Sequence, residues 1–379
     1  MNDRNFAPKF HEVIKKVKSK DEEDRRWAAH ILGEMGEKEG VSFLVELLCD
    51  ESDAVREKAA ESLVRMDGRE VVQKVVPFLR SEKAYLRNIA CEILEGIGED
   101  AIEHLSPLLK DKDNDVRKFV CDIMGNVGSA KALPYLISAL DDPHINVTCA
   151  ACEALGNIGD KNATSALLGL LKKIEKKKIL DEEKKWLIST ILEAIGKIKD
   201  PRAFKEVMKL SSSKDPLILF SLINCLGEMG DSRATGYLLS CLGQPLFGIP
   251  AIKALAKVAE KNEKEVFLAL KNSAEKLVFL RGFLKKLPLE AKREAIFLAG
   301  VAKDKEAVPL LLPFLFDEEE KIREETVKAL LKINLELTFL SGQEDYIEAI
   351  KGILEVFLYD NDEELRKKAG RLLRKLTST

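Results

Sequence analysis

Two cysteines three residues apart, Cys149 and Cys152, have a spacing typical of redox or metal-binding dyads. Such dyads work at a helix N-terminus, where the helix dipole stabilises the thiolate. Here Pro143 is the expected first residue of a helix, so Cys149 falls well inside it. Cys91, Cys121 and Cys152 also share one position in a repeated pattern that alanine occupies elsewhere. We therefore predict that these thiols fill a core and do no chemistry.

Other residues that carry chemistry are scattered along the chain. No histidine has a cysteine or carboxylate at the spacing of metal ligands, and no glycine-rich phosphate loop or nucleophile motif is present. The histidines are His11, His30, His104 and His144. We predict no catalytic residue, no metal and no cofactor.

The elements that position these residues form a repeat. The phrase NDVRKFVCDIMGNVG, which begins at Asn114, returns in related forms, and its arginine recurs every 30 or 31 residues, with a threonine in the fifth copy. Apolar residues at three- and four-residue spacing predict a helix, which Gly128 ends, and a second helix follows. No segment alternates as a strand does, so the predicted class is all-α. The repeated positions are Arg25, Arg56, Arg87, Arg117 and Thr148.

The repeated phrase resembles the HEAT repeat, in the variety known as phycobilisome-lyase-like (PBS lyase HEAT-like). The residues that carry the resemblance are Asp111, Arg117, Gly125, Gly128, Ala132, Pro134 and Leu136. The resemblance covers nearly the whole chain and is clearest over residues 21–171. It implies an alpha-alpha superhelix, a solenoid of roughly ten to eleven helical hairpins. That fold hosts many functions.

Breaks in the pattern divide the chain into predicted segments. A Lys-rich insertion at 172–178 and the stretch from Asn272 to Leu287 disturb the register, and each is either a bend or a longer helix. The predicted segments are an N-terminal capping helix at 1–20, regular acidic repeats at 21–172, repeats at 173–243, degenerate and more basic repeats at 244–359, and a C-terminal capping helix at 360–379.

The resemblance also implies a role for the repeated arginines. In HEAT repeats an aspartate in the turn bonds the arginine six residues later and ties neighbouring units together. A helix N-terminus favours such a carboxylate, and an arginine fork serves two acceptors. We expect looser coupling at Thr148, Leu219 and Gly248, which lack the arginine. The predicted ladder comprises Asp50, Arg56, Arg87, Asp111 and Arg117, with further aspartates at Asp142, Asp317 and Asp360.

The arginine-bearing helices of HEAT proteins line the concave face, so residues one, two and five after the arginine are candidates for binding. They place aromatic residues and a row of carboxylates on one surface, with no cation predicted between the carboxylates. Two alternatives stay open: Trp186 and Leu187 pack under the insertion, or the glutamates are ordinary solvated residues. The candidates are Trp27, His30, Glu61, Ile89, Glu92, Phe119, Asp122, Glu153, Trp186 and Phe220.

Charge is distributed unevenly. Residues 21–170 hold 17 Lys and Arg against 29 Asp and Glu, a net charge of −12, while the remainder has a net charge of +9. The predicted groove is therefore acidic at one end and basic at the other, and steers partners of opposite sign. The predicted basic patch is Lys253, Lys257, Lys292, Arg293, Lys328 and Lys332.

These features predict a non-catalytic scaffold that binds another protein or peptide through a basic segment. One alternative is an activity like that of bilin lyases, and another is nucleic-acid binding by the basic C-terminal half. A small-molecule ligand is not expected. No apolar run is long enough to span a membrane and the N-terminus does not resemble a secretory signal, so we expect a cytoplasmic protein.

Overall fold

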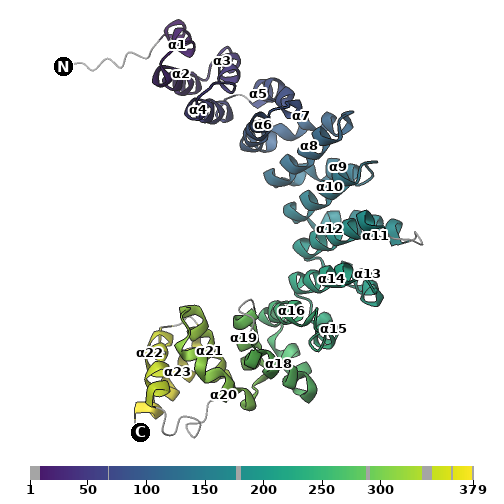
Figure 1. The fold of residues 1–379 in the computed structure, drawn as a ribbon, viewed down its shortest axis with the longest axis vertical. Coiled ribbons are helices and arrows are strands. Elements are labelled where there is room, and N and C mark those ends of the chain that lie inside the picture. The colour runs from purple at the N-terminus through teal and green to yellow at the C-terminus, as the bar shows by residue number, and fades with distance from the viewer. Residues whose placement is uncertain are drawn as a thin grey trace, which may run out of the picture. The chain divides into compact units, whose positions relative to one another are not determined.

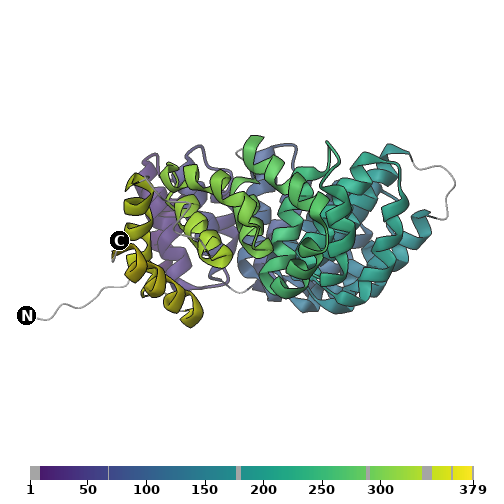
Figure 2. The ribbon, with the colours of Figure 1, turned by 90° about the horizontal axis from the view of Figure 1, so that it is seen from below.

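The computed structural model describes residues 9–66, 68–175, 181–286, 291–334, 344–359 and 362–377. Within these residues every regular element is helical, and both views show coiled ribbons and no arrow (Figures 1 and 2). The predicted all-α class is confirmed. The chain divides into two compact units, Met1–Ala194 and Ile195–Thr379. In the described part of the chain, no helix combines the length and apolar character that crossing a bilayer requires.

Unit 1 consists of two rows of helices (Figure 1). The arginine-bearing helices, here named the A row, contact one another in succession from α2 to α10 and lie on the inner side of the curve of this unit. The A row is α2 (Glu22–Met35), α4 (Asp53–Val64), α6 (Ala84–Ile97), α8 (Asn114–Val127), α10 (Ile145–Ile158) and α12 (Glu182–Ile198), which runs on into unit 2. The B row is α3 (Gly40–Leu47), α5 (Gly68–Val75), α7 (Glu99–Leu105), α9 (Leu133–Ala139) and α11 (Thr164–Glu175), and α1 (Phe10–Val17) covers α2.

Unit 2, taken by itself, also consists of two rows of helices. Its A row is α14 (Pro216–Met229), α16 (Gly248–Lys261), α19 (Lys292–Ala302), α21 (Glu320–Ile333) and α23 (Glu363–Thr377). Its B row is α13 (Phe204–Val207), α15 (Thr235–Cys241), α17 (Glu263–Lys271), α20 (Val308–Leu311) and α22 (Glu344–Phe357).

The two disturbed segments differ. The stretch after Asn272 forms an additional helix, α18 (Ala274–Lys286), while α16 contacts α19 directly. The alternative of a merely longer helix is therefore wrong there. At the Lys-rich insertion, α11 extends to Glu175, which makes it longer than the other B-row helices of unit 1. The remainder of that insertion lies outside the described residues.

Helix α8 shows how the sequence determines one repeat. Asp113 accepts a hydrogen bond from the N–H of Asp115 and begins the helix, and Gly128 ends it with a φ of 70°, a left-handed conformation that favours glycine. Val116, Val120 and Ile123 are buried on one face. A helix with one apolar face must bury that face against other helices. Each unit therefore folds only against its neighbours.

Close contacts between A-row helices set the distance between successive units. A Cβ atom added to Gly125 would lie 2.7 Å from the Cα of Ala154 on the next helix. The same relation recurs at Gly33 with Ser62, at Gly227 with Ala254 and at Gly300 with Ala329. A larger side chain at these positions separates the helices, so small residues are required there.

Candidate functional site

The cysteine dyad lies in the core of α10. Cys149 is the fifth residue of this helix, which begins at Ile145, and both Cys149 and Cys152 are buried. Burial raises the pKa of the Cys121 thiol to about 12 and that of Cys91 to about 11, and it raises the pKa of Cys152 well above its ordinary value. Thiols with raised pKa values stay protonated, so the geometry favours packing over reactivity.

Arg117 joins the units of α8 and α10. Its Nε and Nη2 donate to the two carboxylate oxygens of Asp142, at 2.7 and 2.9 Å, and its Nη1 donates to the backbone carbonyl of Asp111 at 2.8 Å. The pair is nearly enclosed, with 11% of the Arg117 side chain and 7% of that of Asp142 exposed. A buried two-point ion pair of this kind couples successive turns.

This geometry corrects the pairing that the resemblance implied. The carboxylate bound by Arg117 belongs to Asp142, in the next turn, whereas Asp111 contributes only its backbone carbonyl. The carboxylate of Asp111 accepts instead from the N–H of Asp113 in its own turn and from Arg80. An aspartate that caps its own turn cannot also face the arginine six residues later.

The same arrangement occurs in other units. Arg25 binds both carboxylate oxygens of Asp50, at 2.7 and 2.9 Å, and Lys292 binds Asp317 at 2.7 Å. Lys292 is therefore a ladder cation rather than a free member of the basic patch. In the unit of α4, the turn that leads into α6 has Ser81 at the position of the aspartate. Arg56 therefore pairs with Asp53 on its own helix. Asp360 lies outside the described residues.

The ladder aspartates are held in their charged form. Burial by itself raises the pKa of the Asp142 carboxyl, but hydrogen bonds from Arg117 and from the His144 N–H outweigh it and hold the pKa below its ordinary value. The pKa of Asp50 is lowered by the same balance, with Arg25 and the Ser52 N–H as donors. Both pairs thus contribute more to stability when the carboxylate is charged.

The candidate apolar residues differ in exposure. Trp186 is 61% exposed, Phe220 45% and Trp27 37%, while Ile89 and Phe119 are half-buried. Trp186 is thus exposed while Leu187 is buried. The alternative in which both pack under the insertion involves residues 176–180, which lie outside the described residues. Phe220 lies on α14 of unit 2. The candidate apolar residues of unit 1 are therefore Trp27, Ile89, Phe119 and Trp186.

The candidate carboxylates lie along the A row of unit 1. Glu61, Glu92 and Glu153 are exposed, as is His30, and Asp122 is half-buried.

The expectation that no cation separates the carboxylates is wrong. Lys58 pairs with Glu61 and Lys118 pairs with Asp122 at 2.7 Å. Lysines three or four residues before a carboxylate lie on the same face of a helix.

The predicted basic patch of unit 2 is a surface of mixed charge. Its cations lie on the A row, but most of them face carboxylates from neighbouring helices, which a count of charges along the sequence does not detect. The pairs are Lys257 with Glu228, Lys292 with Asp317, Arg293 with Glu325 at 3.6 Å and Lys332 with Glu263 at 2.7 Å. Lys328 lies over the Phe357 ring at 5.3 Å, and Lys253 is half-buried.

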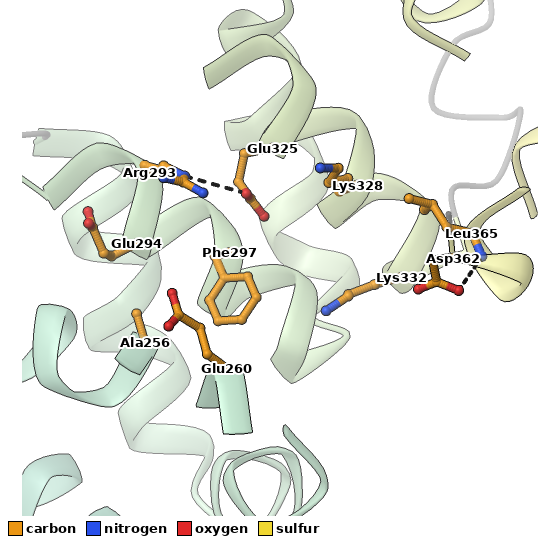
Figure 3. A pocket seen from close by; sticks show the side chains of 10 residues that line it. All are labelled: Ala256, Glu260, Arg293, Glu294, Phe297, Glu325, Lys328, Lys332, Asp362 and Leu365. Atoms are coloured by element: carbon orange, nitrogen blue, oxygen red, sulfur yellow. Dashed lines mark hydrogen bonds and ion pairs between the residues drawn. The ribbon is translucent and has the colours of Figure 1, made fainter. Parts of the chain in front are cut away.

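Some of these residues line a pocket of about 360 Å³ (Figure 3). Glu325 projects into it between Arg293 and Lys328, and Lys332 lies 5.0 Å from the centre of the Phe297 ring. Burial raises the pKa of Glu325, and the nearby cations only partly oppose this effect. Glu260 and Asp362 add further carboxylates, so the pocket does not present a uniformly positive field.

The sequence reasoning missed several exposed aromatic residues, which include Tyr85, Phe316 and Tyr359. Tyr85 is 37% exposed at the start of α6, and the guanidinium of Arg56 lies 4.9 Å from its ring centre. Tyr85 stands two residues before Arg87, whereas the predicted surface consists of positions one, two and five after the arginine. Arg56 belongs to the preceding unit, so the sequence of α6 alone does not indicate this contact.

The sequence matches the family model of HEAT repeats over residues 10–95, 102–179 and 176–256. The chain belongs to the HEAT-repeat family. None of the curated proteins matches its sequence.

Solved structures share its fold. Kap121p bound to Pho4p aligns with 96% of this chain and 45% of its own, at 13% identity and a TM-score of 0.59. A Kap121p mutant with three acidic residues replaced by lysine aligns with 98% of this chain and 46% of its own, at 14% identity and a TM-score of 0.59. The chain thus spans about half the length of Kap121p. An engineered protein aligns with 100% of this chain and 99% of its own, at 21% identity and a TM-score of 0.38.

Proposed function

We propose that the chain is a non-catalytic scaffold that binds a basic segment of a partner protein on the A-row surface of unit 1. The observation that carries this proposal is the combination of exposed carboxylates with Trp27, Ile89 and Phe119 on one row of helices, within a segment of net charge −12. Carboxylates attract a basic segment and set its register, and partly buried apolar side chains supply contact area. The likeness to Kap121p, one structure of which holds Pho4p, supports a protein partner. We place this function in the cytoplasm.

The lysines on this surface refine the proposal. Lys58 and Lys118 neutralise part of the charge of Glu61 and Asp122, whereas Glu92, on the helix between them, is exposed. Pairs at three- or four-residue spacing on a helix surface contribute about 0.3–0.5 kcal/mol each, so a partner cation can replace the lysine at little cost. We therefore expect Glu92 to matter more for binding than Glu61 or Asp122.

The test is a titration of a polybasic peptide, and then of a partner captured with the chain, at low and high salt. Glu92→Lys together with Asp122→Lys should weaken binding by about tenfold or more. The matched control is Asp100→Lys with Glu103→Lys, which makes the same change of charge on exposed residues of α7 in the B row. Equal weakening by both variants would show that net charge alone matters. Unchanged affinity in the A-row variant, with no dependence on salt, would show that the carboxylates are only solvated.

Two other functions have less support. Nucleic-acid binding needs cations that face phosphates, and the unit 2 cations named above mostly face carboxylates. A bilin-lyase-like activity rests on the repeated phrase alone. Co-expression with a phycobiliprotein and a source of bilin tests it directly, since a lyase would make the phycobiliprotein fluorescent.

A further inference from the structure

The unit of α10 lacks the cation that its neighbours contain. In five other units the arginine donates through Nη1 to the backbone carbonyl six residues before it, at 2.7–3.1 Å; these residues are Arg25, Arg56, Arg87, Arg117 and Arg323. In α10 the same carbonyl, that of Asp142, accepts from the hydroxyl of Thr148 at 3.2 Å. A threonine side chain ends at that hydroxyl, so nothing of Thr148 extends toward the following helices as a guanidinium does.

A pocket of about 410 Å³ lies at this place in unit 1. Thr148 lines this pocket, as do Asp181 and Glu183 at the start of α12. Leu170 and Leu187 add apolar surface. Among the described lining residues, four carboxylates accompany two lysines. Lys173 pairs with Asp141, Lys184 with Asp181 and Arg117 with Asp142, while Glu183 is exposed. The combination of apolar residues with the carboxylate of Glu183 fits a long cationic side chain.

We propose that this pocket binds an arginine side chain of the partner segment, which takes the place of the ladder arginine missing at Thr148. This inference rests on the proposed function, because it assigns one residue of the basic partner. The guanidinium would donate to the Asp142 carbonyl and to the carboxylates of α12, while its aliphatic stem lies against Leu187. Arg117 already occupies both carboxylate oxygens of Asp142, so the backbone carbonyl is the acceptor on that side. Lys184 pairs with Asp181 at present and would yield to the planar fork.

Trp186 extends the site along α12. It follows Glu183 by three residues, which places the two on one face of the helix, and it is 61% exposed. An exposed indole beside an acidic pocket offers a surface on which the partner chain stacks. It also reports binding, since the chain contains two tryptophans and Trp27→Phe leaves Trp186 as the only tryptophan, which can be excited selectively over the tyrosines.

The experiment uses the full chain carrying Trp27→Phe and three blocked pentapeptides, Gly-Gly-Arg-Gly-Gly and its lysine and citrulline counterparts. Trp186 emission and calorimetry follow each titration. We expect the arginine peptide to bind at least about tenfold more tightly than the other two, because lysine lacks the fork and citrulline lacks the charge. Thr148→Arg fills the pocket from within and should abolish binding, whereas Thr148→Ser, which keeps the hydroxyl, should retain it. Glu183→Gln, at an exposed site, should weaken the arginine peptide several-fold and leave the citrulline peptide unchanged.

The outcomes separate this inference from the proposed function. Glu92→Lys with Asp122→Lys should weaken the polybasic peptide yet leave the affinity for the single-arginine peptide within about twofold. Equal affinity for the three pentapeptides, or unchanged binding by Thr148→Arg and Glu183→Gln, overturns the arginine pocket and leaves the acidic surface standing. The opposite result is also distinguishable. If Thr148→Arg abolishes arginine-selective binding, but Glu92→Lys with Asp122→Lys leaves the affinity for the polybasic peptide unchanged, the arginine pocket stands and the acidic surface is overturned.

Discussion

Arg117 and Asp142 lie 25 residues apart in the sequence, and the guanidinium of the first binds both carboxylate oxygens of the second at 2.7 and 2.9 Å. The same guanidinium reaches back to the Asp111 carbonyl at 2.8 Å. One side chain thus connects two successive turns. In a solenoid, where each unit contacts only its neighbours, such a link contributes directly to the coupling between units.

Removal of this link should destabilise unit 1. Arg117→Ala leaves the buried Asp142 carboxylate without its charged partner, and we expect the free energy of unfolding to fall by about 1–3 kcal/mol. Arg117→Lys should recover part of this loss, because Lys292 fills the same role toward Asp317. Urea unfolding measures both variants. An unchanged midpoint for Arg117→Ala would mean that the pair contributes no net stability.

The ladder aspartates Asp50 and Asp142 should make the stability of the fold depend on pH. The pKa values of Asp50 and Asp142 are lowered in the folded state, so their contribution is complete above the unfolded value of about 4 and is lost as the pH falls through the folded values. We expect the difference in free energy of unfolding between the wild type and Asp142→Asn to be constant near neutral pH and to shrink below about pH 4. A difference that is the same at pH 7 and at pH 3 would contradict the assignment.

Close packing of the A row should make one glycine sensitive to a single methyl group. Gly125→Ala places a Cβ 2.7 Å from the Cα of Ala154, so the helices must separate, and we expect a loss of about 1–3 kcal/mol. The matched control is Gly169→Ala in α11, where nothing lies within 4 Å of the added atom. That change should stabilise the helix by up to about 1 kcal/mol, because alanine has the higher helix propensity. Thermal unfolding distinguishes the two, and similar shifts would contradict the close approach.

The cysteines should differ in reactivity. Cys49 is exposed, whereas Cys121, Cys152 and Cys225 are buried, and burial raises the pKa of all three buried thiols. An alkylating reagent at neutral pH should label Cys49 quickly and the buried thiols only after unfolding. Mass spectrometry of digested samples measures this order. Rapid labelling of Cys152 in the folded protein would contradict the packing role and indicate that Cys149 and Cys152 form a reactive site.

The sequence by itself determined the class of fold and the local structure of each repeat. Three- and four-residue apolar spacing, Gly128 at a left-handed helix end and the recurring arginine all act within one unit, over distances that the chain fixes directly. The burial of Cys121 and Cys152 followed from the same spacing.

Only the tertiary structure decided which residues meet across helices. The choice of Asp142 over Asp111 as the partner of Arg117 depends on how one unit stacks on the next, because the Asp111 carboxylate is turned toward the N–H of Asp113. The pairing of the unit 2 cations with carboxylates has the same origin, and so does the pocket beside Thr148. Stacking brings together side chains that are 25 or more residues apart, and the geometry of that contact is set by the packing of small residues such as Gly125 against Ala154 rather than by any local pattern.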